Sequence, residues 1–448
     1  MFTQVVNGTV FTSSSMIENG AVLYADGIIC DIGPRAGVEA RFRQRHDYPV
    51  RLRTIDAGQG IILPGFINSH HHLYSTFARG MAVPGAPAKN FTQVLEKLWW
   101  KLDKTLAPED VYYSALIPLL ECIRNGVTTI VDHHESQGFQ EGVLDPLQQA
   151  VEAAGIRAAL CLGASDRYQR GRAGVSENER FLEKLRQRPS RLVRAMVGLH
   201  ASFTVNDDTL ERSVAAARRY RAGLHIHCAE DRADQEDALK KYGMRVVARL
   251  KNFGALDEGT LLVHCVHVDE KEMNLIREND CSVIHNPESN MNNAVGCADV
   301  LRMLKKGIRV GLGSDGMSSD MLAQMRCAFL LQRHDQGDPR LAFAEAPAML
   351  LQNNAAIAER IFSQKLGRLE KGAPADLVIL DYVPPTPLHR DNFLGHLIFG
   401  MTDAVCDTVV CAGKVLMRHK KIVGLDEELI CEKSRQLAAA FWKRIARA

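Results

Sequence analysis

Eight short apolar runs, spaced through the middle of the chain, constrain the fold more than any other feature of the sequence. Segments with helical apolar spacing separate these runs, an alternation typical of parallel β/α units. Measured between residues near the run ends, from 70 to 315, the spacings are 63, 30, 37, 27, 37, 21 and 30 residues. Apart from the first, they suit one strand plus one helix. The sequence therefore predicts an α/β fold with a (β/α)8 TIM-like barrel. The runs are FINSHHH, VTTIVDHH, IRAALCLG, VRAMVGLH, GLHIHCAE, TLLVHCVH, CSVIHN and IRVGLGSD.

The two ends of the chain have a different pattern from the middle. Residues 1–60 contain alternating runs broken by Asn-Gly, Asp-Gly and Gly-Pro, which are strand and turn signals. Residues 364–448 contain the run ADLVILDY, a hairpin pattern around Ala412-Gly413 and then helical apolar spacing. We expect residues 1–60 and 364–448 to pair into one small sheet domain, and residues 61–363 to form the barrel.

Charge and cysteine content narrow the classes of partner and compartment. The chain has 448 residues and a net charge of +2, far less basic than a protein that neutralises many phosphates. Its 11 cysteines include no Cys-x-x-Cys pair, as expected of buried free thiols in a reducing compartment. We find no signal peptide in MFTQVVNGTV and no apolar stretch of about 18 residues. We therefore expect a cytoplasmic protein with no nucleic-acid or membrane partner.

Most of the eight runs end in side chains that can bind a metal or move a proton. The C-terminal strand ends of such a barrel meet at one face, where active sites lie. A single histidine at a strand end is more often a structural residue, but seven of the eight runs end in His or Asp. This density indicates a site. The residues are His70, His72, His133, His134, His200, His227, His264, His267, His285 and Asp315.

His70-x-His72 is the sharpest element of this pattern. On a strand, residues two apart point to the same side, so both imidazoles could bind one metal ion. The alternative is a His-rich turn without metal. His71 should face away, where it would support the ligands or pack.

Two further runs offer a third imidazole and two carboxylates. His227 ends the fifth run and Glu230 follows it, which would supply a metal ligand and a proton carrier. The alternative is a strand that ends in solvated charge. Asp315 ends the eighth run and could bind the metal and accept a proton from its bound water. The alternative for Asp315 is a helix N-cap.

Several motifs of the sequence resemble those of a known family. LPGFINSHHHLYS, GLHIHCAE, LLVHCVH, HNPESN and GLGSD are similar to the amidohydrolase superfamily, in its cytosine, guanine and chlorotriazine deaminase branch. The terminal segments resemble the split β-sandwich that flanks the barrel in that family. More narrowly, LWWKLD, IVDHHES and SNMNN resemble the SsnA-type aminohydrolases. The likeness covers nearly the whole chain.

The resemblance assigns roles residue by residue. It implies metal ligation by His70, His72, His227 and Asp315, with Asp315 also acting as the base. Glu230 falls on the proton-shuttling glutamate, His264 on the histidine that orients the attacking water, and His200 on a substrate contact. Binuclear relatives carry a lysine at the fourth strand end, where this chain has MVGLHASF, so the resemblance implies one metal. The roles of His71, His133 and His134 stay open.

The resemblance implies a metal-dependent aminohydrolase that deaminates a purine-, pterin- or triazine-like small molecule. The cofactor would be one divalent ion, Zn²⁺ first, with Fe²⁺ or Mn²⁺ as alternatives. One alternative activity is opening of a cyclic amide without ammonia release, and another reading is a metal-binding scaffold without turnover. The resemblance also suggests a homodimer.

The insertion GMAVPGAPAKNFTQVLEKLWWKLD fills the long first gap and is a candidate lid. Trp99 and Trp100 could close over a flat heterocycle, but we favour the interpretation that they pack a helix onto the barrel. Phe77 and Arg79, just after the first strand, are better candidates for contacting substrate.

Overall fold

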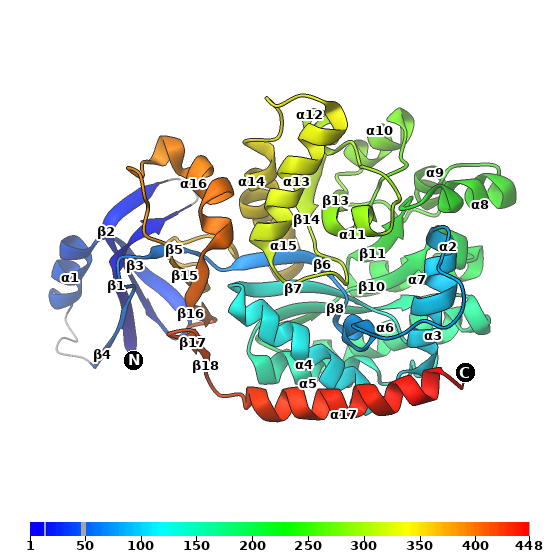
Figure 1. The fold of residues 1–448 in the computed structure, drawn as a ribbon, viewed down its shortest axis with the longest axis horizontal. Coiled ribbons are helices and arrows are strands. Elements are labelled where there is room, and N and C mark those ends of the chain that lie inside the picture. Colours follow the sequence, from blue (N-terminus) through cyan, green and yellow to red (C-terminus); the bar gives the residue numbers. More distant parts are fainter. Residues whose placement is uncertain (13–14, 46–50, 448) are drawn as a thin grey trace.

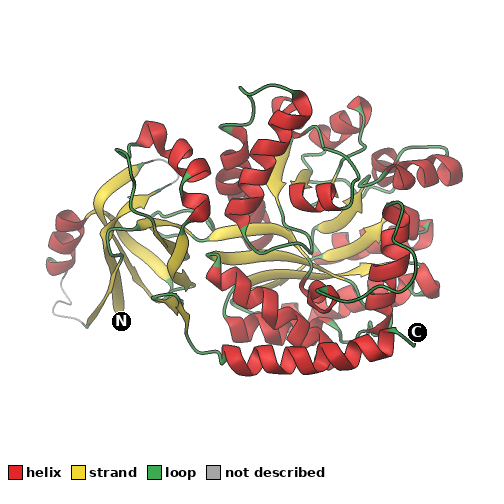
Figure 2. Cartoon of the chain, in the orientation of Figure 1, coloured by secondary structure: helices red, strands yellow, loops and turns green. Residues whose placement is uncertain are grey.

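The computed structural model describes residues 1–12, 15–45 and 51–447. Two bodies lie side by side in Figure 1, a barrel enclosed by helices and a separate sheet. Figure 2 shows helices around the barrel strands, whereas few helices accompany the other sheet.

The barrel contains the eight predicted strands in chain order, each parallel to its neighbour, so this prediction is confirmed. A short strand, β9 (Val193–Ala195), adds to the edge of β8. The barrel strands are β6 (Phe66–His71), β7 (Val127–His134), β8 (Arg157–Ala164), β10 (Val197–Ala201), β11 (Leu224–Cys228), β12 (Leu261–His264), β13 (Ser282–His285) and β14 (Arg309–Leu312).

The barrel closes between its last and first strands at the residues that carry the candidate ligands. The backbone N–H groups of Ser314 and Asp315 donate to the carbonyl of His70, over 3.0 and 3.1 Å. The His72 N–H donates in turn to the Asp315 carbonyl, over 3.4 Å. The same hydrogen bonds therefore close the barrel and position the side chains of the candidate ligands.

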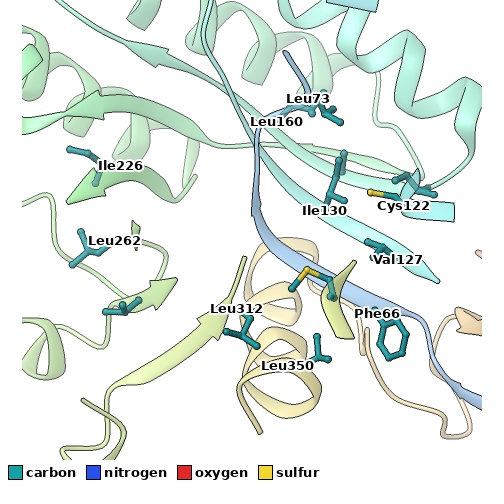
Figure 3. Close-up of a cluster of buried hydrophobic side chains, with 14 of the residues drawn as sticks. Phe66, Leu73, Cys122, Val127, Ile130, Leu160, Ile226, Leu262, Leu312 and Leu350 are labelled. Atoms are coloured by element: carbon teal, nitrogen blue, oxygen red, sulfur yellow. The ribbon is translucent and has the colours of Figure 1, made fainter. Parts of the chain in front are cut away.

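Helices cover the outside of the barrel because the strands are apolar on their outer faces as well. Figure 3 shows Val127, Ile130 and Leu160 of the barrel strands near Cys122 of α4. The barrel helices are α4 (Pro108–Arg124), α5 (Leu144–Ala154), α6 (Gly171–Gln187), α7 (Asp207–Tyr220), α8 (Arg232–Tyr242), α9 (Val246–Asn252), α10 (Glu270–Glu278), α11 (Pro287–Asn292), α12 (Val300–Lys305), α13 (Met321–Gln336), α14 (Glu345–Ala348) and α15 (Asn354–Phe362).

Both chain ends contribute to the second sheet, as predicted. Strand β5 pairs in parallel with β1 and antiparallel with β15, with Ile62 opposite Ile379, which joins the N-terminal and C-terminal segments. We call this nine-stranded unit the terminal sheet. Its strands are β1 (Phe2–Phe11), β2 (Met16–Ala25), β3 (Ile28–Pro34), β4 (Leu52–Asp56), β5 (Ile61–Pro64), β15 (Leu377–Asp381), β16 (Val405–Cys411), β17 (Lys414–Arg418) and β18 (Lys421–Ile422).

Two elements lie on the other side of the expected domain boundaries. Residues 61–64 form β5 and belong to the terminal sheet. The C-terminal helix α17 (Glu427–Ile445) returns to the barrel and packs along α4 (Figure 1). The indole N–H of Trp442 in α17 donates to the carbonyl of Phe77 over 2.7 Å. Among the described residues, no helix is both long and apolar enough to cross a membrane.

The insertion folds into α2 (Phe91–Val94), a π-helical turn η2 (Leu95–Trp99) and α3 (Trp100–Thr105). The Asn90 side chain caps α2 by accepting a hydrogen bond from the Gln93 N–H over 3.0 Å. The segment contributes Trp99 and Trp100 to a pocket at the C-terminal ends of the barrel strands.

Candidate metal and active site

The structure brings the four predicted metal ligands together at this face. The Asp315 Oδ1 atom lies 3.0 Å from His72 Nε2 and 3.7 Å from His70 Nε2. The Nε2 atoms of His72 and His227 are 3.2 Å apart. Residues that are far apart in the sequence thus surround one point, because strand order carries β6, β11 and the end of β14 to the same mouth.

Each ligand histidine is held through its other ring nitrogen. The Nδ1 atom of His72 bonds to the backbone carbonyl of His133, and that of His227 to the carbonyl of His200 over 2.7 Å. The Nδ1 atom of His70 lies 2.9 Å from Nε2 of His225. All three Nε2 atoms are therefore free to point at the centre.

This donor set fits a divalent metal ion. The Nε2 atom of His70 is buried and has no hydrogen-bond partner within the described part of the chain. Three imidazole nitrogens and one carboxylate are typical zinc ligands, and outer partners on their far nitrogens are typical of metal sites. Without a bound ligand, these buried side chains would keep polar atoms that have no partner, which costs free energy.

The pKa values of two carboxylates in the site are shifted in opposite directions. Burial raises the pKa of Asp315, but His72 and His70 outweigh it and hold that pKa well below its usual range. Burial, with the nearby charge of Asp315, raises the pKa of Glu230 well above its usual range. Such a pair separates a base from an acid within one site.

One short helix, α11, supplies side-chain partners to all three proton-handling groups. The Ser289 hydroxyl donates to Asp315 Oδ2. The remaining partners come from the same helix and its C-terminal cap: His264 Nδ1 donates to Asn290 Oδ1 over 2.8 Å, and Asn293 Nδ2 donates to Glu230 Oε1 over 3.2 Å. These partners were missed in the sequence, where HNPESN and SNMNN served only as motifs of resemblance.

The backbone is strained where the catalytic candidates sit. His264 and Asp315 have φ angles of 72° and 55°, and Ala229, just before Glu230, has 48°. Residues with a Cβ atom rarely adopt this left-handed region, and such strain clusters at functional sites. These backbone angles set the directions in which the side chains at the strand ends point.

The pocket beside these ligands has an aromatic wall and a polar corner. Its wall contains Trp99 and Trp100, so the tryptophans that we expected to pack on the barrel also face the pocket. In the corner, Arg167 donates to Asp103 Oδ2 over 2.7 Å and to Glu135 Oε2 over 3.1 Å. Other lining residues include His72, Tyr74, Phe91, Leu95, His200, Phe203, His227, Glu230, Ser289, Asn293, Asp315 and Met317.

Among the predicted substrate contacts, only His200 lines the pocket. Phe77 is buried, with its ring 5.8 Å from that of Phe441 in α17. Arg79 forms an ion pair with Glu121 of α4. The chain turns into a 3₁₀ helix, η1 (Leu73–Ala78), directly after β6. Phe77 and Arg79 therefore do not line the pocket in this structure.

The three histidines of open role are all buried. The Nε2 atom of His71 lies 3.3 Å from the Ser319 hydroxyl, away from the ligands. The Nε2 atom of His133 donates to the Leu199 carbonyl over 3.0 Å, and the His134 ring contacts that of Tyr74.

Comparisons with known proteins agree with this architecture. The model of the Amidohydrolase family matches residues 61–416. A 5-methylthioadenosine/S-adenosylhomocysteine deaminase of Syntrophomonas wolfei is 32% identical over 431 residues, which cover 95% of each chain. A 5'-deoxyadenosine deaminase of Methanosarcina mazei is 30% identical over 435 residues, 96% of this chain and 95% of that one. A zinc-bound adenosine deaminase from Xanthomonas campestris shares the fold, with a TM-score of 0.84 at 24% identity, and covers 100% of this chain and 99% of its own.

Proposed function

This chain belongs to the amidohydrolase family and is a hydrolytic deaminase of a heterocyclic small molecule; from that premise we propose that it is a zinc enzyme whose substrate is an adenosine-like nucleoside. The observation that carries the proposal is that two carboxylates, Glu230 and Asp315, lie at a cluster of three histidines, with the pKa of Glu230 raised and that of Asp315 lowered. Hydrolytic removal of a ring amino group needs both groups at one centre.

We propose that His70, His72, His227 and Asp315 hold the ion. When bound, a divalent ion supplies Lewis acidity and lowers the pKa of a coordinated water. Three nitrogens and one oxygen favour zinc, and the same set also suits iron or manganese.

Different side chains around the ion accept and donate the protons of the reaction. Asp315 accepts a proton from the attacking water. His264 Nδ1 is engaged by Asn290, so its Nε2 atom, 3.4 Å from Glu230 and 3.9 Å from Asp315, is placed to orient that water. Glu230 donates a proton to the ring nitrogen beside the attacked carbon, so that negative charge does not build up on the ring. The amino group takes the proton that Asp315 accepted, the bond between the ring carbon and this nitrogen breaks, and ammonia leaves. The hydroxyl group left on the ring carbon becomes a carbonyl and returns its proton to Glu230.

The polar corner supports a nucleoside rather than a bare ring. Arg167 occupies one oxygen of Asp103, and its guanidinium lies 5.1 Å from the Trp100 ring. The other oxygen, Asp103 Oδ1, has no partner among residues that the structure describes. A buried acceptor of this kind suits the hydroxyl groups of a sugar, while the tryptophans suit the flat base.

An ammonia-release assay over a substrate panel tests the proposal. We expect release from 5'-deoxyadenosine, 5'-methylthioadenosine or S-adenosylhomocysteine, at a kcat/KM at least ~10-fold above that for adenine, because the free base leaves Asp103 without its partner. Loss of metal during chelation should abolish turnover, and zinc should restore it.

Three outcomes would contradict it. Preference for the free base or a triazine would reject the nucleoside, ring opening without ammonia would identify a cyclic amidohydrolase, and an inert zinc-loaded protein would identify a scaffold. The homodimer and the cytoplasmic location stay predictions.

A further inference from the structure

The three ligand histidines differ in what anchors them. His72 and His227 are held by backbone carbonyls, which no substitution of the acceptor residue removes. His70 is held by a side chain, that of His225, across 2.9 Å. His225 lies two residues before His227 on β11, and it is fully buried.

The direction of each proton in this contact follows from the ligand role of His70. If Nε2 of His70 offers its lone pair to the ion, Nδ1 carries the proton and donates to Nε2 of His225. Neutral His225 must then carry its own proton on Nδ1. That atom lies 3.7 Å from Sγ of Cys161, which lies 3.5 Å from the carbonyl of Asp132. A chain of three donors thus ends on the backbone.

The surroundings leave His225 little freedom to do anything else. Its ring packs edge-on against those of His70 and His133, with centroids 5.0 and 4.8 Å away. Cys161 is as fully buried as His225 and belongs to β8. Both partners therefore stand on barrel strands rather than on loops, which gives the contact a rigid support.

We propose that His225 is a positioning residue that fixes the ring and the tautomer of the ligand His70, with Cys161 as its outer anchor. The inference rests on the proposed metal site. His225 does not touch the ion itself, so its effect reaches the ion only through His70. Outer partners of metal-bound imidazoles typically contribute 10- to 100-fold in metal affinity or activity.

Zinc affinity, measured by competition with a chromophoric chelator, tests the role in the full-length protein. We expect His225→Leu to weaken zinc binding about 10- to 100-fold, and His225→Gln to recover most of it because the amide oxygen can accept from His70 Nδ1. The visible spectrum of the cobalt(II)-loaded protein should change in the Leu variant and return toward that of the wild type in the Gln variant.

His285→Leu is the matched control. His285 is also a fully buried histidine at the end of a barrel strand, but no partner holds its ring nitrogens in the described chain. We expect zinc affinity within about 3-fold of the wild type for this variant, because it touches none of the four ligands' anchors.

The outcomes separate this inference from the proposed metal site. A wild-type protein that binds no zinc would remove the site itself. Tight zinc binding by the wild type and equally tight binding by His225→Leu, with the same cobalt spectrum, would overturn the positioning role alone. Should His225→Leu fail to fold, Cys161→Ala replaces it, and we expect this variant to bind zinc more weakly by a factor of about 2 to 5. Unchanged zinc affinity in Cys161→Ala, together with loss of zinc binding in His225→Gln, would overturn the proposal.

Discussion

The barrel mouth and the terminal sheet bury different kinds of side chain. At the mouth, buried ring nitrogens of His70 and His264 have no hydrogen-bond partner among the residues that the structure describes. Inside the terminal sheet most buried residues are aliphatic, for example Ile62 and Ile379, and a buried polar side chain such as Gln4 has a hydrogen-bond partner. A sheet that only has to hold together pairs its buried polar groups, whereas a site that must hold an ion and move protons keeps some of them open.

The backbone shows the same contrast. In the terminal sheet, several left-handed residues lie in hairpin turns such as Asp26-Gly27 and Ala412-Gly413, where glycine adopts these angles at little energetic cost. At the mouth, His264 and Asp315 adopt such angles, although each carries a full side chain. The comparison predicts that substitutions at the mouth change chemistry with little change in stability, and that substitutions in the terminal sheet do the reverse.

The largest expected effect is at the mouth. Glu230→Gln should lower kcat/KM by about 10²- to 10⁴-fold, because the amide cannot protonate the substrate ring. Metal content should be unchanged, since Glu230 is not among the proposed ligands, and the unfolding temperature should stay near that of the wild type. Glu236→Gln, an exposed carboxyl of α8, is the control. More than a tenth of wild-type activity at full metal content would argue against Glu230 as the acid.

The reverse effect is expected in the terminal sheet. Ile379→Ala should lower the free energy of unfolding by about 2–5 kcal/mol, because it opens a cavity where β15 meets β5. Per folded molecule, kcat/KM should change less than about 2-fold. Val383→Ala, at a side chain that is 70% exposed, should change stability by about 0.5 kcal/mol at most. A fall in kcat/KM for the folded Ile379→Ala protein would show that the two regions are coupled.

The same contrast explains what could be predicted from the sequence. Barrel strands were recognisable because their apolar runs are buried on both faces, and His70-x-His72 because strand geometry puts both rings on one side. The terminal sheet was recognisable from alternation and turn signals. These patterns are local, so a single sequence carries them.

Features that depend on packing across the chain were not recognisable in the same way. The surroundings of Phe77 were not predictable because its ring packs against Phe441 of α17, more than 350 residues later in the chain. The hydrogen bond from Asn293 to Glu230 depends on how α11, which follows β13, lies across the mouth of the barrel. The anchor of His70 needed the barrel to bring β6, β11 and β8 together, a relation that no spacing along the sequence expresses.

The smallest expected effect concerns the polar corner, where stability and pH are linked. Burial raises the pKa of Glu135 to about 8, although Arg167 opposes the shift. Folded protein therefore keeps a proton on Glu135 between pH 4.5 and 8 that the unfolded chain releases, so the free energy of unfolding should fall as pH rises through this window. Glu135→Gln mimics the protonated acid and cannot ionise, and it should lack this part of the pH dependence.

Chemical denaturation at pH 5 and pH 8 measures the difference. We expect the stability of Glu135→Gln relative to the wild type to rise between these pH values by about 1–3 kcal/mol. Glu236→Gln is again the control, because it makes the same change at an exposed residue of α8, outside the polar corner. A constant gap for Glu135→Gln would mean that Glu135 is ionised in the folded protein beside Arg167. The polar corner would then be an ordinary buried ion pair, and the contrast with the terminal sheet would be confined to the metal ligands and the groups that α11 holds.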